Sequence, residues 1–220
     1  MDTLYHRHVV EDYAYGDDFY GIPLMDWMRE KVLPHKIAVY DAGMEMLATP
    51  AVAGKIRKRD EFVWNLVHHD LSKLCFIELY GYYLNFKKFD DGSAIPKTEH
   101  NLRMWDEAWN HHQKHNEHHP EHWISIEKNG DVKALEMPEI YVFEMVADWF
   151  GASRSYGGDM KDWVPKNIDR FLMHPKTLQL TKAILVNMGI EWEGNTIDTC
   201  PWPEMDLPAY QAALVVGGKT

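Results

Sequence analysis

The chain has 220 residues, of which 45% are hydrophobic and 13% aromatic, and this composition is typical of a folded globular protein rather than of a disordered chain. Its formal net charge of −11, from 34 acidic and 23 basic residues, disfavours a polynucleotide partner, because a duplex-binding surface needs clustered Lys and Arg. A small anionic substrate is still allowed, since bound cations can reverse a local field.

The cysteine content and the N-terminal stretch bear on the cellular compartment. Only Cys75 and Cys200 are present, without a CxxC pair, which excludes a disulfide scaffold and a thiolate zinc site and suits a reducing cytoplasm. The chain begins with MDTLYHRHVVEDYAYGDD, which is too polar and acidic for a signal peptide. No apolar run approaches the ~20 residues of a membrane span. We therefore expect a cytoplasmic protein without a membrane partner.

The first quarter of the chain passes from an irregular segment to helices. Residues 1–23 are aromatic, acidic and turn-rich, with no clear period. The pattern from 24 to 47 is helical, and Pro34 should end one helix there or kink it. Asp60 is expected to cap the next helix, at 60–70, whose apolar residues recur at helical spacing.

Two further helices are predicted in the middle of the chain. Ser72 could cap a helix at 73–86, and residues 87–97 resemble a loop. Thr98 could cap the next helical segment, which we expect to extend over 99–120.

The last part of the chain contains two more predicted helices. After a loop at Gly130, Pro138 suits the first turn of a helix at 139–150. Residues 153–170 are polar and are expected to be irregular. A final helix is predicted from Pro175 to Met188, followed by a glycine at its C-terminal end. Because almost every periodic segment has a period near 3.6, the sequence predicts an all-α single domain of six to eight helices with an irregular C-terminal tail.

Four acidic or histidine residues carry potential chemistry. His69 and Asp70 are adjacent at the end of an apolar helix, where burial is costly without a partner. Asp148 lies among apolar residues, with Glu144 one turn earlier on the same helical face. His35 follows a helix-breaking proline. The structural alternatives are a histidine–carboxylate hydrogen bond in a half-exposed turn, an Asp148 paired with Arg or Lys, and a surface or capping His35.

A histidine-rich stretch, NHHQKHNEHHPEHW at 110–123, places six histidines in fourteen residues. His112 shares a helical stripe with Leu102, Trp105 and Trp109, so it is the best candidate to face the core. His118 or His119 is the next candidate. The other members should be solvated, namely His111, His115 and His122. The alternative is a cluster without any function.

Taken in chain order, these residues resemble the HD-domain superfamily of metal-dependent phosphohydrolases, an all-α fold. HHDLSK at 68–73 is similar to the HD-[LI]-x-K signature, with Lys73 at the matching lysine. ADW at 147–149 occupies the place of the final aspartate motif, and His35 matches the first histidine. The resemblance implies an HD-like helical domain at 24–190, between an N-terminal segment at 1–23 and a tail at 191–220.

A closer resemblance is to a family of unknown function that is common in bacteriophage genomes. Its features are HD-x-SK, an H-x-x-x-N-x-HHPE-x-W block and EM-x-x-DW. The first stands at 69–73, the second at 112–123 and the third at 144–149. This resemblance implies an HD-type site and supplies no substrate.

The HD resemblance implies a divalent metal site with one or two ions of Mn, Co, Ni, Zn, Fe or Mg. One ion would be held by His35, His69, Asp70 and Asp148, and would lower the pKa of a bound water. A second ion, bridged by Asp70, would add His112 and either His118 or His119.

Other residues could act around the metal. Glu78 could orient ligand histidines, as could Glu121, or Glu78 could serve as a general base. Lys73, Arg154 and Lys161 could contact phosphate, although surface solvation is the alternative for each. Five aromatic residues could either stack on a nucleobase or belong to the core: Trp105, Trp109, Trp123, Tyr141 and Trp149.

The leading functional hypothesis is hydrolysis of a nucleotide or a similar small phosphoester by a metal-activated water. Two alternatives stay open. One is an HD-type di-iron oxygenase, and the other is a non-catalytic metal-containing domain that binds a nucleotide or a protein. A homodimer is compatible with each hypothesis, and a phage-encoded chain would work in the host cytoplasm.

Overall fold

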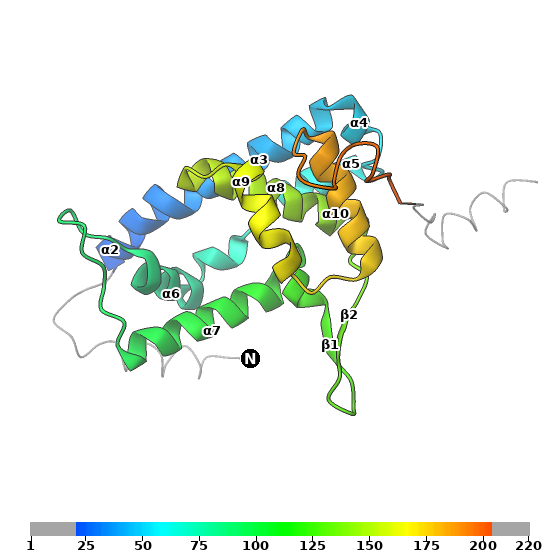
Figure 1. Ribbon diagram of the computed structural model, residues 1–220. Helices are drawn as coiled ribbons and strands as arrows, with labels where there is room; N and C mark the ends of the chain where they lie inside the picture. Colours follow the sequence, from blue (N-terminus) through cyan, green and yellow to red (C-terminus); the bar gives the residue numbers. More distant parts are fainter. Residues whose placement is uncertain (1–20, 204–220) are drawn as a thin grey trace, which may run out of the picture. The chain divides into compact units, whose positions relative to one another are not determined.

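A computed structural model describes residues 21–203, which are predominantly helical, so the predicted all-α class is confirmed (Figure 1). None of the helices in this range combines the length and the apolar character that crossing a bilayer would require. The chain divides into two compact units. Unit 1 contains the residues up to Ile37 and Asp70–Asn116, and unit 2 contains Ala38–His69 and the residues from Glu117 onward.

Unit 1 begins with a helix that continues through Pro34, which contradicts the predicted break or kink. Helix α2 (Gly21–Trp27) is followed by the π-helical turn η1 (Met28–Val32), and then by α3 (Leu33–Ala48). In the π turn the Leu33 N–H bonds to the Met28 carbonyl. Pro34 then lies in the first turn of α3, where its missing N–H is tolerated. The expected irregular segment 1–23 therefore ends earlier, because Gly21–Pro23 are helical, and the rest of it lies outside the described residues.

The remainder of unit 1 is built from a short 3-10 helix and two α-helices. They are η2 (Leu71–Leu74), α6 (Phe76–Phe86) and α7 (Glu99–His115). Thr98 caps α7 as predicted, since its Oγ1 accepts from the Asn101 N–H at 3.2 Å. α7 ends at His115 instead of reaching 120. The predicted cap at Ser72 is wrong, because α6 begins at Phe76 after Cys75 and Ser72 lies within η2, where its hydroxyl donates to Glu78 at 3.0 Å.

Helices α6 and α7 lie side by side (Figure 1). Their close approach depends on Gly81, because a Cβ there would lie 2.4 Å from the Ala108 Cβ and 2.7 Å from the Met104 carbonyl oxygen. The apolar core of the unit is formed by Leu24, Trp27, Val32, Leu79, Tyr80, Tyr83 and Leu84. The packing thus holds the first turn of α6 against the C-terminal half of α7.

Unit 2 contains the rest of α3 and the remaining elements. These are α4 (Pro50–Ala53), α5 (Arg59–His68), η3 (Pro120–Trp123), β1 (Ile124–Ile126), β2 (Val132–Ala134), α8 (Glu139–Tyr156), α9 (Met160–Asn167), η4 (Ile168–Arg170) and α10 (Pro175–Asn187). β1 and β2 form an antiparallel hairpin (Figure 1), with Ser125 opposite Lys133. This hairpin was not predicted.

Several predicted boundaries in unit 2 change. α5 begins at Arg59, so Asp60 lies inside its first turn rather than at the cap. α8 extends six residues past the predicted 150, to Tyr156, and Gly157 follows with φ 73°. The segment 153–170 is not irregular, since α9 lies within it and the Asp159 side chain caps that helix through the Lys161 N–H at 2.8 Å. α10 matches its prediction closely.

Helix α8 is the central element of the unit 2 core. Its buried residues include Phe143, Val146 and Ala147, and it packs against α5, α9 and α10. Each large apolar side chain buried here contributes roughly 1.5–3 kcal/mol. Burial on nearly all sides explains the almost unbroken apolar run of this helix. It also means that Glu144 and Asp148, the two carboxylates in the middle of the helix, need partners within the protein.

Candidate functional site

The His69-Asp70 pair lies at a sharp corner of the backbone. α5 ends at His68, and Asp70 has φ 53° and ψ 31°, in the left-handed region. It is the only non-glycine residue with a positive φ among the residues that the structure describes. Such a conformation costs roughly 1–3 kcal/mol, and strain of this kind is concentrated at functional sites. The corner ends the helix directly before the His69-Asp70 pair.

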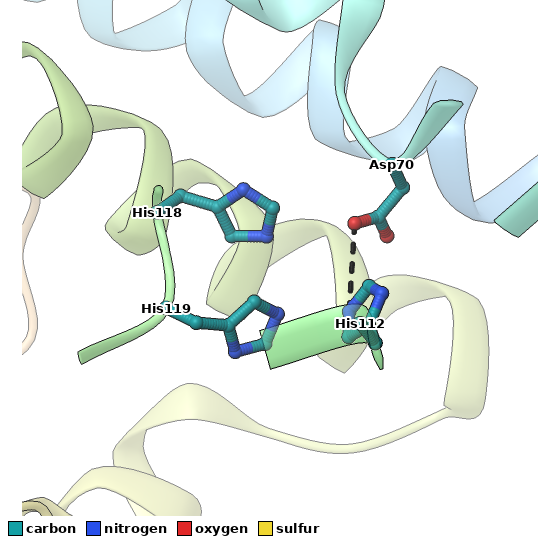
Figure 2. Close-up of side chains that lie close together, drawn as sticks. All are labelled: Asp70, His112, His118 and His119. Carbon is teal, nitrogen blue, oxygen red and sulfur yellow. Dashed lines mark ion pairs between the residues drawn. The ribbon is translucent and has the colours of Figure 1, made fainter. Parts of the chain in front are cut away.

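In unit 1, Asp70 is the centre of a buried group that we name the Asp70 cluster: His35, Asp70, Lys73 and His112. One carboxylate oxygen lies 3.3 Å from His35 Nε2 and 2.6 Å from Lys73 Nζ. The other lies 3.6 Å from His112 Nε2, the ion pair that Figure 2 marks with a dashed line. Only 1–2% of Asp70, His35 and His112 is exposed. The predicted proximity of these three residues is therefore observed.

Glu78 contacts this cluster through the Nδ1 atom of His112. Its carboxylate is fully buried and accepts hydrogen bonds from His112 Nδ1 at 2.8 Å, His111 Nδ1 at 2.6 Å and the Ser72 hydroxyl at 3.0 Å. Burial opposes ionisation of Glu78, but the hydrogen bonds that it accepts from His112, His111 and Ser72 lower its pKa. An ionised Glu78 requires a proton on His112 Nδ1, which leaves the Nε2 lone pair directed at Asp70.

His112 itself is held in the neutral form. Burial lowers its pKa, against the opposing effect of Asp70 and Glu78. A neutral imidazole with an unprotonated Nε2 is the form that binds a metal ion. Trp109 stacks on the same ring, with centroids 5.8 Å apart. Trp109, proposed to bind substrate, thus lies beside the Asp70 cluster.

Unit 2 carries a second buried group, the Glu144 cluster: His69, His118, Glu144 and Asp148. One oxygen of Glu144 lies 3.0 Å from His69 Nδ1 and 3.2 Å from His118 Nδ1. On the opposite side of the His69 ring, Nε2 lies 3.4 Å from Asp148 Oδ1. Burial would raise the pKa of Glu144, but hydrogen bonds from His118 and His69 outweigh it and lower the pKa to about 2. Glu144 is therefore ionised and both histidines donate from Nδ1.

The remaining histidines of the 110–123 stretch differ in their surroundings. His119 is half-buried next to His118 (Figure 2), with ring centroids 4.5 Å apart. Its Nδ1 lies 3.8 Å from Glu121. His115 is exposed, as predicted. His111 was expected to be solvated, and this expectation is wrong, because it is half-buried and donates to Glu78. The helical-stripe argument considered only apolar neighbours and did not identify a buried carboxylate on α6.

The three residues predicted to contact phosphate lie in different surroundings. Lys73 lies in the Asp70 cluster, and its Nζ is also 5.2 Å from the centre of the Tyr82 ring. Arg154 forms a two-pronged ion pair with Glu45, at 2.9 and 2.6 Å. Lys161 is exposed in the first turn of α9. Of these three side chains, only Lys73 contacts a proposed metal ligand within its own unit, namely Asp70.

The described residues thus contain buried groups of His, Asp and Glu that could hold a metal ion. Imidazole nitrogens and carboxylate oxygens are suitable donors for first-row divalent metals. Sequence reasoning missed the role of Glu144, although its position one turn before Asp148 in an apolar helix was a usable signal. It also missed Asn116, whose amide donates to the Ser72 hydroxyl and to the His112 carbonyl, each at 2.7 Å.

A family model described as a family of unknown function (DUF5662) matches residues 26–188, a range that includes both clusters. No curated protein and no solved structure matches the chain.

Proposed function

We propose that this chain, which belongs to the family of unknown function DUF5662, is a metal-dependent phosphohydrolase that acts on a nucleotide or a similar small phosphoester. The observation that carries the proposal is a repeated arrangement of buried groups. In each unit a glutamate holds the Nδ1 atom of a histidine, and the Nε2 atom of that histidine approaches an aspartate. A carboxylate behind a ligating histidine is the usual support of a metal-binding imidazole.

The proposed ligands of the principal ion are His35, His69, Asp70 and Asp148, as the HD resemblance implies. Within unit 1, His35 Nε2 and an Asp70 oxygen are 3.3 Å apart, and within unit 2, His69 Nε2 and an Asp148 oxygen are 3.4 Å apart. Separations of this size suit donor atoms that share an ion. When bound, the metal would supply Lewis acidity and lower the pKa of a coordinated water.

A second ion belongs to the same proposal. His112 presents Nε2 to the Asp70 oxygen that faces away from His35, at 3.6 Å, so Asp70 could bridge two ions. His118 or His119 would complete this ligand set. Glu78 and Glu144 act in the proposal as positioning residues, because they fix the orientation and the protonated nitrogen of the histidines that they contact.

Substrate binding is assigned first to Lys73 and Trp109. The Lys73 ammonium contacts the carboxylate of Asp70 and would attract a phosphate oxygen. Trp109, stacked on His112, is half-buried and could hold a nucleobase. Arg154 and Lys161 remain secondary candidates. The net charge of −11 favours a small substrate over a polynucleotide. The low cysteine content favours a cytoplasmic location. A homodimer is compatible with the proposal.

The first test is the metal content of untagged protein purified without chelator, measured by plasma mass spectrometry. We expect one or two equivalents of Mn, Co, Ni, Zn, Fe or Mg, and a loss of at least one equivalent in Asp70→Ala. The exposed Asp90→Ala variant is the matched control and should keep its metal. Phosphate release from a panel of nucleotides should then follow the metal content.

Other results would redirect the proposal. Two equivalents of iron with visible absorbance would favour the di-iron oxygenase, and bound metal without turnover of any nucleotide would favour a non-catalytic domain. Absence of metal, or metal content unchanged by Asp70→Ala, would contradict a metal centre at Asp70.

A further inference from the structure

Unit 1 contains a second set of metal-binding side chains, at the start of α6 and on α7. Cys75 immediately precedes α6, Glu78 lies in the first turn of that helix, and His111 belongs to the neighbouring α7. The Cys75 sulfur, a Glu78 oxygen and a His111 ring nitrogen all lie within 4.8 Å of one another. Cys75 and His111 are half-buried, so the group can be reached from solvent, whereas Glu78 is fully buried.

The donor atoms differ in kind from those of the Asp70 cluster. A thiolate, an imidazole and a carboxylate together suit Zn²⁺, which binds sulfur at about 2.3 Å and nitrogen or oxygen at about 2.0–2.2 Å. Donor atoms within 4.8 Å of one another can surround such an ion after small side-chain rotations. We propose that Cys75, Glu78 and His111 form a Zn²⁺-type site, the outer site, which is separate from the ligands of the phosphohydrolase centre.

The fourth coordination position of the outer site would be open to water or to His115. His115 lies one turn beyond His111 and is exposed, and the two rings stack with centroids 3.8 Å apart. Binding would displace the Cys75 thiol proton to solvent, since the thiolate is the ligand form. Because the sequence has no CxxC pair, it predicts that no thiolate zinc site is present. In the fold, however, the packing of α6 on α7 brings Glu78 and His111 close to the single thiol of Cys75.

Glu78 connects the outer site with the Asp70 cluster. One of its oxygens contacts His111, and the other contacts His112. An ion at the outer site would compete with His111 for Glu78 and thereby weaken the support of His112. The outer site is thus placed to modulate the inner histidine, although its existence does not depend on the proposed hydrolysis.

Cobalt absorbance tests the outer site directly. The full-length chain, stripped of metal, would be titrated with Co²⁺ while the near-ultraviolet thiolate-to-cobalt charge-transfer band is recorded. Only two cysteines exist in the chain, so Cys200→Ser is a matched control for Cys75→Ser. Cys200 is buried in unit 2, where its thiol donates to Asn195 at 3.6 Å. We expect the band in the wild type and in Cys200→Ser, its loss in Cys75→Ser, and its displacement by Zn²⁺.

A second variant assigns the histidine. His111→Gln should raise the Co²⁺ concentration needed for half of the band at least tenfold, while circular dichroism confirms folding of each variant. Asp70→Ala should keep the band, so failure of the inner centre and failure of the outer site are distinguished. No band in the wild type, a band that persists in Cys75→Ser, or an unchanged titration in His111→Gln would overturn the outer site.

Discussion

Two buried glutamates perform the same task in different units. Glu78 accepts from the Nδ1 atoms of His111 and His112, and Glu144 accepts from those of His69 and His118. An ionised carboxylate that accepts from the Nδ1 atoms of two imidazoles fixes both the rotamer and the tautomer of each ring. The Nε2 atoms of His69 and His112 are consequently directed toward an aspartate. These glutamates are therefore as important for the proposed centre as the ligands themselves.

Glu144→Gln tests this role with a nearly isosteric change. The amide oxygen of glutamine can still accept from both Nδ1 atoms, but it lacks the negative charge that strengthens these hydrogen bonds and raises the basicity of the two imidazoles. We expect the affinity for Mn²⁺ to fall 10–100-fold, measured by isothermal titration calorimetry on metal-free protein. Glu45→Gln, at an exposed carboxylate that pairs with Arg154, should bind as the wild type does. Equal affinities in the two variants would show that Glu144 does not position the histidines.

At the scale of helices, the sequence predicts those helix ends that are determined by interactions between residues close together in the chain. Thr98 starts α7 and a left-handed Gly189 follows α10, because a cap and a positive φ (83° at Gly189) are properties of short segments. Helix α9 was missed because its sequence is polar and contains Pro165. The continuous helix at Pro34 was also missed, since a π turn has no simple sequence signature.

The approach of α6 to α7 makes a testable prediction about Gly81. A methyl group there would lie 2.4 Å from the Ala108 side chain and 2.7 Å from the Met104 carbonyl, which is backbone and cannot rotate away. Gly81→Ala should therefore lower the free energy of unfolding by roughly 1–3 kcal/mol. It should also weaken metal binding, since α6 carries Glu78 and α7 carries His112.

Urea denaturation of both variants would measure the difference. Gly54→Ala is the control, because its nearest neighbour would be 3.6 Å away and its φ of −66° is helical. There alanine should be neutral or slightly stabilising. A Gly81→Ala variant as stable as Gly54→Ala would mean that the two helices can separate without cost.

For the molecule as a whole, the residue types of the candidate site were predictable and their partners were not. His35, His69, Asp70, His112, His118 and Asp148 were selected from motif order and helical spacing. Which nitrogen of each histidine faces a carboxylate depends on contacts between residues far apart in the sequence, such as His69 with Glu144. Those contacts arise only when the helices pack, and no period in the sequence encodes them.

Metal binding at the Asp70 cluster should stabilise the entire fold, because an ion that binds only the native state adds its binding free energy to folding. At a free Mn²⁺ concentration of 100 times Kd the gain is about 2.7 kcal/mol, or roughly 5–10 °C in Tm for a chain of this size. Mn²⁺ is the suitable probe, since it prefers oxygen donors and should avoid the thiol of Cys75. Differential scanning calorimetry with and without Mn²⁺ measures the shift.

The variants decide which residues cause this stabilisation. Asp90→Ala should show the wild-type shift in Tm, whereas Asp70→Ala should show almost none. The metal-free Asp70→Ala protein should itself be less stable than the wild type, because alanine is disfavoured in the left-handed conformation of this residue and because the substitution removes the buried carboxylate that contacts Lys73. The quantity compared is therefore the Mn²⁺-induced shift in Tm within each variant. An equal Mn²⁺ shift in both variants would place the bound ion elsewhere in the chain, and the proposed centre would then lack its principal ligand.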